Sequence, residues 1–234
     1  MATGKLYLIP TPLGAEGLSA VPIYWRPILH RLDYFIAERA KTARRFIKST
    51  APERPIDVLH FEELNKRTAE SDIDGFLKPL LEGHDVGLLS EAGCPGVADP
   101  GSAVVARAHR LDIAVIPLVG PSSILLALMA SGMNGQHFSF LGYLPPKQPA
   151  LGKEIQRLEA TARRQHSTQI FIETPYRNRA LVEQLLRTLQ PQTHLCIAAD
   201  LTLPTECIRT RTVAAWRQQE VPDLHKRPAI FLIG

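Results

Sequence analysis

The sequence predicts an α/β protein made of two α/β domains, and two observations support this prediction. First, short apolar segments alternate with segments that have helical spacing, which is typical of repeated β–α units and a mostly parallel sheet. Second, Pro145, Pro146 and Pro149 interrupt the pattern before a further β–α series begins. We therefore expect one domain over residues 1–144 and another over residues 145–234.

In the first domain, five short runs rich in aliphatic and aromatic residues have the length and composition of strands. The segments between them have helical spacing: within residues 70–82, Ile73, Leu77 and Leu81 follow one another at intervals of four. Serines begin the last helix, as is common at helix N-termini. The expected elements are strands at residues 5–10, 34–37, 57–61, 85–90 and 113–118 and helices at residues 39–48, 70–82, 102–111 and 122–131.

The second domain continues with alternating helices and strands. Leu181, Leu185 and Leu189 recur at intervals of four, which predicts an amphipathic helix. The runs "TQIFIET", "HLCIAAD" and "AIFLIG" are apolar enough for buried strands. The expected elements are helices at residues 153–165 and 177–189 and strands at residues 168–174, 194–200 and 229–234.

The composition is that of an ordinary soluble globular protein, with 45% of the 234 residues hydrophobic and 21% charged. Cys94, Cys196 and Cys207 match neither a disulfide framework nor a zinc-binding pattern. The N-terminal segment lacks the basic and apolar regions of a signal peptide. We expect a cytoplasmic protein without a bound metal.

One long stretch, residues 113–137, contains no Asp, Glu, Lys or Arg. Pro117, Gly120 and Pro121 interrupt it, so neither half is long enough to cross a bilayer. A buried strand, a turn and a buried helix explain this stretch without a membrane.

Four loops rich in glycine or proline each follow an expected strand, at residues 10–14, 90–101, 119–123 and 173–178. Glycine reaches positive φ without strain and proline restricts φ, so such loops have defined shapes. The carboxyl ends of parallel strands share one edge of a sheet, where ligands bind in open α/β folds. The loops therefore predict a ligand site formed largely by backbone groups.

Several other chemistries lack their sequence signatures. The chain has no phosphate-binding P-loop, no G-x-G-x-x-G dinucleotide fingerprint and no G-x-S-x-G nucleophile motif. The eight histidines show no spacing typical of metal ligands. Ser122 and Ser123 are expected to cap a helix or to donate hydrogen bonds to a ligand.

Positive charge is concentrated in the helix expected at residues 39–48, while the chain as a whole has a net charge of +4. A solvated helix face explains such a cluster, and a polyanion such as RNA is the more specific explanation. The residues that we expect to bind an acidic substrate are Arg39, Lys41, Arg44 and Arg45. A second basic group comprises Arg157, Arg163 and Arg164.

Taken together, the loops resemble those of the tetrapyrrole methylase superfamily of S-adenosylmethionine-dependent methyltransferases, and most closely its RNA branch. The similar segments are "LYLIPTPLG", "LLSEAGCPGVADPG", "VIPLVGPSSILLALMASG", "FSFLGYLPPK", "IFIETPYRN" and "AADLT", in the family's order. The resemblance implies two α/β domains of the tetrapyrrole methylase type with the cofactor cleft between them. It also implies that glycines in the loops let the backbone approach the cofactor closely.

The resemblance implies that the cofactor is S-adenosylmethionine and that the acceptor is a 2'-hydroxyl of ribose in small-subunit (16S) ribosomal RNA. It further implies a homodimer. Candidate general bases, chosen because they follow strands, are Glu38, Glu91 and Glu173. The implied cofactor-binding residues are Pro12, Leu13, Gly14, Glu91, Ala92, Gly93, Pro95, Val97, Gly120, Ser122, Ser123, Leu141, Thr174, Pro175, Leu201, Thr202, Pro228 and Ala229.

The chain departs from the RNA-branch pattern at several positions. Glu91 and Cys94 replace the usual Asp and Thr, and Ala199 replaces an arginine. The additional C-terminal region of longer members is absent, so we expect a shorter subgroup. Two alternatives stay open: a methyltransferase acting on a tetrapyrrole or another small molecule, and a non-catalytic RNA-binding or cofactor-sensing module.

Overall fold

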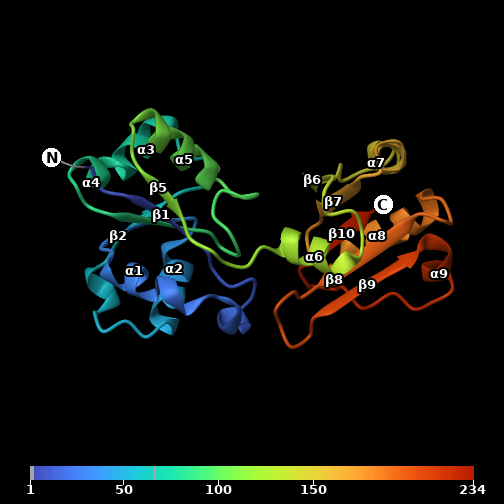
Figure 1. Ribbon diagram of the computed structural model, residues 1–234, viewed down its shortest axis with the longest axis horizontal. Coiled ribbons are helices and arrows are strands. Elements are labelled where there is room, and N and C mark those ends of the chain that lie inside the picture. The colour runs from blue at the N-terminus through green and yellow to red at the C-terminus, as the bar shows by residue number, and fades with distance from the viewer. Residues whose placement is uncertain (1–2, 66) are drawn as a thin grey trace. The chain divides into compact units, whose positions relative to one another are not determined.

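The computed structural model describes residues 3–65 and 67–234, which form two compact units (Figure 1). The first unit ends at Pro121 and the second begins at Ser122. Each contains one five-stranded sheet with helices packed against it. The expected α/β class and the two α/β domains are therefore confirmed.

The sheet of the first unit is entirely parallel and has the strand order β3-β2-β4-β1-β5. Four of its strands coincide closely with the apolar runs of the sequence. The strand β3 begins later than expected, because a short 3-10 helix occupies part of the predicted run. The strands are β1 (Leu6–Ile9), β2 (Tyr34–Ala37), β3 (His60–Glu63), β4 (Val86–Leu89) and β5 (Val115–Pro117).

Helices cover both faces of this sheet (Figure 1). Alternate strand residues point to opposite faces, so Tyr7 packs with α1 and α2 while Leu6 packs with α3, α4 and α5. The expected helix at residues 70–82 is divided, because Pro79 has no N–H to continue the hydrogen-bonding pattern. The helices are η1 (Gly17–Ala20), η2 (Ile23–Trp25), α1 (Arg26–Arg31), α2 (Ala40–Ser49), η3 (Ile56–Val58), α3 (Glu70–Phe76), α4 (Lys78–Leu81) and α5 (Gly101–Arg110).

The sheet of the second unit is mixed, with the strand order β6-β7-β10-β8-β9. Only the β6–β7 pair is parallel among the pairs of this sheet in the described residues. The expectation of a mostly parallel sheet therefore holds for the first unit and is wrong for the second. The strands are β6 (Phe138–Tyr143), β7 (Thr168–Ile172), β8 (His194–Ala199), β9 (Cys207–Thr212) and β10 (Ala229–Ile233).

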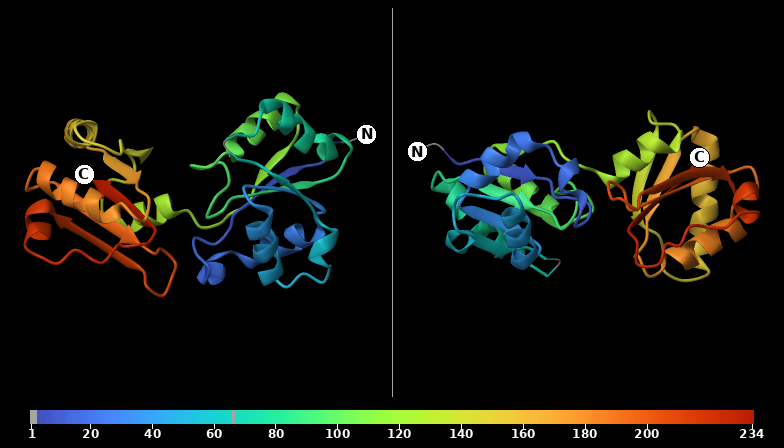
Figure 2. Two further views of the ribbon diagram at one scale, coloured as in Figure 1. Left: turned by 180° about the vertical axis from the view of Figure 1, so that it is seen from behind. Right: turned by 90° about the horizontal axis from the view of Figure 1, so that it is seen from below.

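The core of the second unit lies between this sheet and α7, α8 and α9, with Phe171 and Phe231 stacked at its centre. The opposite face of the sheet contacts α6 through β9 and β10 (Figure 2). No helix in residues 3–65 and 67–234 combines the length and apolar character needed to span a membrane. The helices are α6 (Ser123–Ser131), α7 (Ala150–Gln165), α8 (Asn178–Thr188) and α9 (Val213–Arg217).

The structure divides at Pro121, before the boundary that the sequence suggested after residue 144. Helix α6 packs on β9 and β10, and β6 pairs with β7, so both elements belong to the second sheet. Pro145 and Pro149 therefore lie in the connection between β6 and α7, inside the second unit.

Candidate functional site

Three loops of the first unit meet at the carboxyl edge of its sheet, where β4, β1 and β5 are neighbours. Two backbone hydrogen bonds join the loop after β1 to the loop after β4: Thr11 N donates to Gly93 O at 3.0 Å, and Gly93 N donates to Thr11 O at 3.1 Å. Ligands bind at this edge in open α/β sheets. The fold therefore assembles loops that are far apart in the sequence where a ligand is expected.

Two buried hydroxyl groups stabilise this junction. Ser90 Oγ donates to Gly93 O at 2.6 Å, and Thr11 Oγ1 donates to Ser90 O at 3.2 Å. Both side chains are almost completely buried, so these bonds satisfy polar groups that solvent does not reach. They hold the first turn of the loop at residues 90–101 in one conformation.

Gly93 and Gly120 are required by the packing of the loops themselves. Gly93 has a φ of +77°, and a Cβ there would lie 3.1 Å from Leu13 Cδ2 and 3.2 Å from Pro121 O. A Cβ at Gly120 would lie 2.2 Å from Pro10 Cβ. Packing between the loops therefore favours glycine at both positions, independently of any ligand.

Asp99 organises the second half of the same loop. Its Oδ1 accepts hydrogen bonds from Gly96 N at 2.7 Å and Gly101 N at 2.8 Å, at the start of α5. Burial raises the pKa of the Asp99 carboxyl, while these two hydrogen bonds act in the opposite direction. Nearby, Cys94 Sγ donates to Pro121 O at 3.4 Å, and burial raises the pKa of the Cys94 thiol.

Two of the three candidate general bases share this edge. Glu38 follows β2 and Glu91 follows β4, and the last residues of these neighbouring strands, Ala37 and Leu89, are paired in register. The backbone of both glutamates therefore lies at the carboxyl edge of the first sheet. No hydrogen bond or ion pair to Glu91 is found among residues 3–65 and 67–234, so its carboxylate has no protein partner in the described part of the chain.

The third candidate, Glu173, follows β7 in the second unit and is held by its surroundings. Its side chain is only 7% exposed, and Oε1 accepts hydrogen bonds from Thr174 N and Arg177 Nη2, both at 2.6 Å. These two contacts hold the carboxylate against its own loop and against the residue before α8. The geometry therefore favours a structural role for Glu173.

The second unit has a comparable edge. Because β10 runs antiparallel to β7 and β8, its first residues lie beside their last ones: Ala229 pairs with Ala199, and Ile230 pairs with Ile172. The loops that follow β7 and β8 therefore gather with the segment that precedes β10. The predicted residues at this edge are Thr174, Pro175, Leu201, Thr202, Pro228 and Ala229.

The other predicted cofactor-binding residues are divided between the units. Ser122 is the N-cap of α6, where its Oγ accepts a hydrogen bond from Leu125 N at 3.5 Å, as the sequence suggested for these serines. Ser123 begins α6, and Leu141 on β6 packs against the second core. The loops of the first unit carry Pro12, Leu13, Gly14, Glu91, Ala92, Gly93, Pro95, Val97 and Gly120.

A family model described as Tetrapyrrole (Corrin/Porphyrin) Methylases matches residues 5–215, which include almost all of the loops described above. The chain belongs to the tetrapyrrole methylase family. The resemblance inferred from the motifs is thereby confirmed, together with the expectation that the protein is a methyltransferase.

Several relatives of this methylase are named ribosomal RNA small subunit methyltransferase I. The one from Buchnera aphidicola subsp. Schizaphis graminum (strain Sg) is 27% identical over 99% of this chain and 78% of its own length. The one from Micromonospora olivasterospora is 33% identical over 80% of this chain and 56% of its own length. The alignments therefore leave part of each relative without a counterpart in this chain.

Solved structures share the fold of this methylase. The methyltransferase CobJ matches with a TM-score of 0.65 and 19% identity, over 99% of this chain and 94% of that chain. Uroporphyrin-III C-methyl transferase from Thermus thermophilus, solved with S-adenyl homocysteine, matches with a TM-score of 0.56 and 18% identity, over 99% of this chain and 97% of that chain. These likenesses confirm the tetrapyrrole methylase fold.

The edge of the second sheet where β7 and β8 end combines a buried apolar residue with a hydroxyl group that is unpaired in the described part of the chain. A ligand such as S-adenosylmethionine needs hydrogen-bonding groups within apolar walls. Leu201 is buried, and the Oγ1 atom of Thr202 beside it is buried with no partner within the described residues. Among these residues, no group of three or more His, Cys, Asp or Glu side chains has an arrangement suited to a metal ion.

The predicted basic residues lie on and just before helix α2 of the methylase. Ala43, Phe46 and Ile47 face the core, whereas the cationic side chains of the helix are exposed. The Arg44 guanidinium lies 4.6 Å from the centre of the Phe61 ring, a cation–π contact. The exposed basic residues are Arg39, Lys41, Arg44, Arg45 and Lys48.

The second basic group has a different environment. Arg157 pairs with Glu154 on the same helix at 2.6 Å. Arg163, with His166 and His194, lines a cavity of about 360 Å³ where β7 and β8 begin, at the edge of the second sheet away from the predicted cofactor residues. Arg163 therefore lies at the opposite edge of the second sheet from the predicted cofactor residues of this unit.

The sequence reasoning missed several residues that shape the site. Three of them, Thr11, Ser90 and Asp99, lie in the predicted loops. Short polar side chains in loops often bond to nearby backbone groups, so their residue types were a usable signal. Arg227, which contacts Asp200 across 27 positions of the chain, offered none. Its partner is determined by the antiparallel pairing of β8 and β10.

Proposed function

We propose that this methyltransferase transfers a methyl group from S-adenosylmethionine to a ribose 2'-hydroxyl of small-subunit (16S) ribosomal RNA. The observation that carries the proposal is the carboxyl edge of the first sheet. There, the loops after β1, β4 and β5 meet beside Glu38 and Glu91, and the exposed basic helix α2 begins at the same edge. The names of the relatives supply the RNA substrate.

Bound S-adenosylmethionine would supply an electrophilic methyl group. In the first unit, the candidates for holding it are backbone groups of the loops after β1 and β4. In the second unit, the candidate is the hydroxyl of Thr202. The contribution of the chain to the reaction is orientation: the acceptor hydroxyl must lie in line with the methyl group and away from water.

A ribose hydroxyl is a weak nucleophile, so its proton must be accepted during the reaction. We infer that Glu91 is a better candidate for this role than Glu173, because Glu173 is already paired with Arg177. Glu38 stays a candidate, since it lies at the same edge as Glu91.

Helix α2 would contact the RNA backbone. Phosphate contacts increase affinity without reading sequence, and arginine and lysine supply them. The apolar face of α2 is buried against the sheet, so its cationic face is presented to solvent by a rigid element.

A direct assay tests this function. The purified protein is incubated with labelled S-adenosylmethionine and small ribosomal subunits from a strain that lacks its gene, and the 16S RNA is digested and analysed by mass spectrometry. One new 2'-O-methylated nucleotide is expected. Transfer to a tetrapyrrole or another small molecule, with none to RNA, would overturn the RNA acceptor and identify that molecule as the substrate. Cofactor binding without any transfer would favour a sensing module.

We also propose that the protein is a cytoplasmic homodimer. Leu125 and Met129, one turn apart on α6, are 51% and 78% exposed. Exposed apolar side chains grouped in this way are typical of association surfaces. Sedimentation equilibrium should give twice the chain mass of 25.9 kDa. A single species of monomer mass at micromolar concentration would reject the dimer.

A further inference from the structure

The loop after β8 has an unusual backbone conformation. Asp200 and Thr202 have φ values of 52° and 70°, in the left-handed region that residues other than glycine rarely adopt. Leu201 lies between them and is buried. Two such residues in three positions persist only where the surrounding structure holds them.

The side chain of Asp200 supplies part of this support. Its Oδ2 accepts hydrogen bonds from Thr205 Oγ1 and Arg227 Nε, both at 2.7 Å. The Asp200 side chain is only 8% exposed and that of Arg227 is 25% exposed. The ion pair is therefore shielded from solvent, and removal of either partner leaves a buried charge without compensation.

The guanidinium of Arg227 connects three separate segments. Besides Asp200, it donates from Nη1 to Asp223 O at 2.8 Å and from Nη2 to Thr205 O at 2.6 Å. The planar guanidinium group donates to all three acceptors at once, and the ammonium group of lysine does not reproduce this geometry. The loop after β8 is thereby fixed to the segment that leads into β10.

Backbone bonds extend the connection to the loop after β7. Asp200 N donates to Pro228 O at 3.0 Å, and Lys226 N donates to Pro175 O at 3.2 Å. Asn178 Nδ2 donates to Arg227 O at 2.7 Å from the first turn of α8. The three segments that carry the predicted cofactor residues of the second unit therefore form one connected polar network.

We propose that Asp200 and Arg227 are positioning residues for S-adenosylmethionine. Neither touches the cofactor; the pair stabilises the loop in which Asp200 and Thr202 have positive φ, and it keeps Leu201 and Thr202 beside Pro228 and Ala229. This inference rests on the proposed function, in which these four residues bind the cofactor. The role is distinct from that of Glu91, since it affects binding more than the chemical step.

The test uses Asp200→Asn, Arg227→Lys and the double variant. Asparagine keeps the size of aspartate without its charge, and lysine keeps the charge of arginine without its fork. S-adenosylhomocysteine affinity is measured by calorimetry, and kcat is measured at saturating cofactor. We expect each single change to weaken binding about tenfold and to alter kcat less than about threefold. The double variant should lose less affinity than the two single losses combined, because both changes alter the Asp200–Arg227 bond.

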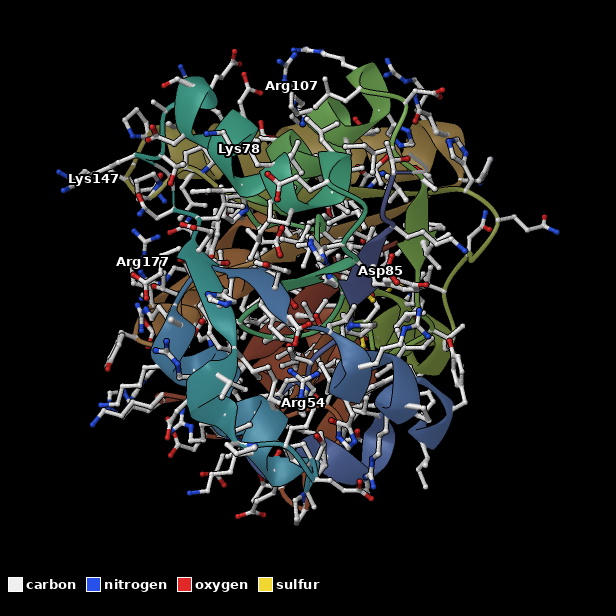
Figure 3. All side chains as sticks on the ribbon, turned by 90° about the vertical axis from the view of Figure 1, so that its left-hand side faces the viewer. Arg54, Lys78, Asp85, Arg107, Lys147 and Arg177 are labelled. Atoms are coloured by element: carbon white, nitrogen blue, oxygen red, sulfur yellow. The ribbon has the colours of Figure 1, made fainter. Side chains whose placement is uncertain are left out.

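Asp74→Asn is the matched control. Asp74 also pairs with an arginine, Arg107 (labelled in Figure 3), at an Nε–Oδ1 distance of 2.5 Å, but this pair lies on α3 and α5, outside the network. Its loss should leave cofactor affinity unchanged. Hydrogen exchange supplies the structural readout: in the Asp200 and Arg227 variants, faster exchange should be confined to residues 200–206 and 223–228.

The outcomes separate the two proposals. If the wild-type protein does not bind S-adenosylhomocysteine, the proposed function fails. If it binds and the Asp200 and Arg227 variants bind equally well, only the positioning role is overturned. Faster exchange throughout the second unit would also overturn it, because the pair would then support the whole fold.

Discussion

Gly120 packs directly against the ring of Pro10, so closely that a β-carbon at Gly120 would lie 2.2 Å from Pro10 Cβ and 2.5 Å from Pro10 Cγ. The two residues follow the neighbouring strands β1 and β5 on the carboxyl side. This packing joins two of the loops that form the candidate site, independently of any ligand.

The first prediction follows from that packing. Gly120→Ala should lower the free energy of unfolding by about 1–3 kcal/mol, because the loop must move to accommodate the methyl group. Gly135→Ala is the matched control, since a Cβ there meets nothing within 4 Å. Its effect should be less than about 1 kcal/mol. Urea denaturation measures both values, and equal stability of the two variants would contradict the packing argument.

The second prediction distinguishes the glutamates. Glu91→Gln should lower kcat about a hundredfold and leave S-adenosylhomocysteine affinity nearly unchanged, as expected for a general base. Glu173→Gln should instead lower the melting temperature, because it removes the charge that pairs with Arg177. Methyl-transfer kinetics and thermal denaturation of both variants test this division. A larger loss of kcat in Glu173→Gln than in Glu91→Gln would reverse the assignment.

The third prediction concerns helix α2. Replacement of Arg44 and Arg45 together by Ala should weaken RNA binding and reduce its salt dependence by roughly 0.7 logarithmic units for each phosphate that the helix no longer neutralises. The matched control replaces Arg179 and Arg187, two exposed arginines of α8, and removes the same charge. Binding is measured over a range of salt concentrations. Equal losses of affinity in both double variants would indicate a general charge effect instead of a specific surface.

The fourth prediction concerns Asp99 and pH. Burial raises its pKa above the ordinary value of 3.8, so the folded state binds the proton more tightly than the unfolded chain does. The stability that this group contributes is therefore greatest below pH 3.8 and falls as the pH rises towards the raised folded value. Asp99→Asn accepts the same hydrogen bonds without titrating.

Urea denaturation of both proteins at several pH values tests this prediction. The wild-type protein should lose stability relative to Asp99→Asn as the pH rises above 3.8, while other carboxylates cancel in the difference. A difference that is independent of pH would contradict the shifted pKa.

Local patterns in the sequence were sufficient for most of the first unit. Strands β1, β2 and β4 are continuous apolar runs because both faces of this parallel sheet are covered, and a buried run is recognisable without knowledge of its partners. The strand β3, with the sequence "HFEE", is mostly exposed and was predicted less accurately. The loop at residues 90–101 was also recognisable from the sequence. Gly93 and Gly96 have positive φ, which favours glycine, and glycines are visible in the sequence.

Edge strands were harder to predict. The strand β9 has the sequence "CIRTRT", whose alternating arginines and threonines give little apolar signal, and it became a strand through its antiparallel pairing with β8. The unit boundary was misplaced for a related reason. Pro145 and Pro149 indicate only a local break in regular structure. Helix α6 precedes them in the chain, but it packs on β9 and β10 and therefore belongs to the second unit.

By itself, the sequence determined the α/β class, the loops of the candidate site and the methylase family, since each depends on residues that are close together in the chain. Only the tertiary structure decided which polar groups meet. Asp200 and Arg227, like Ser90 and Thr11, are joined across long stretches of chain because strand pairing brings them together. Once buried, such groups must find partners, and the fold determines which partners are within reach.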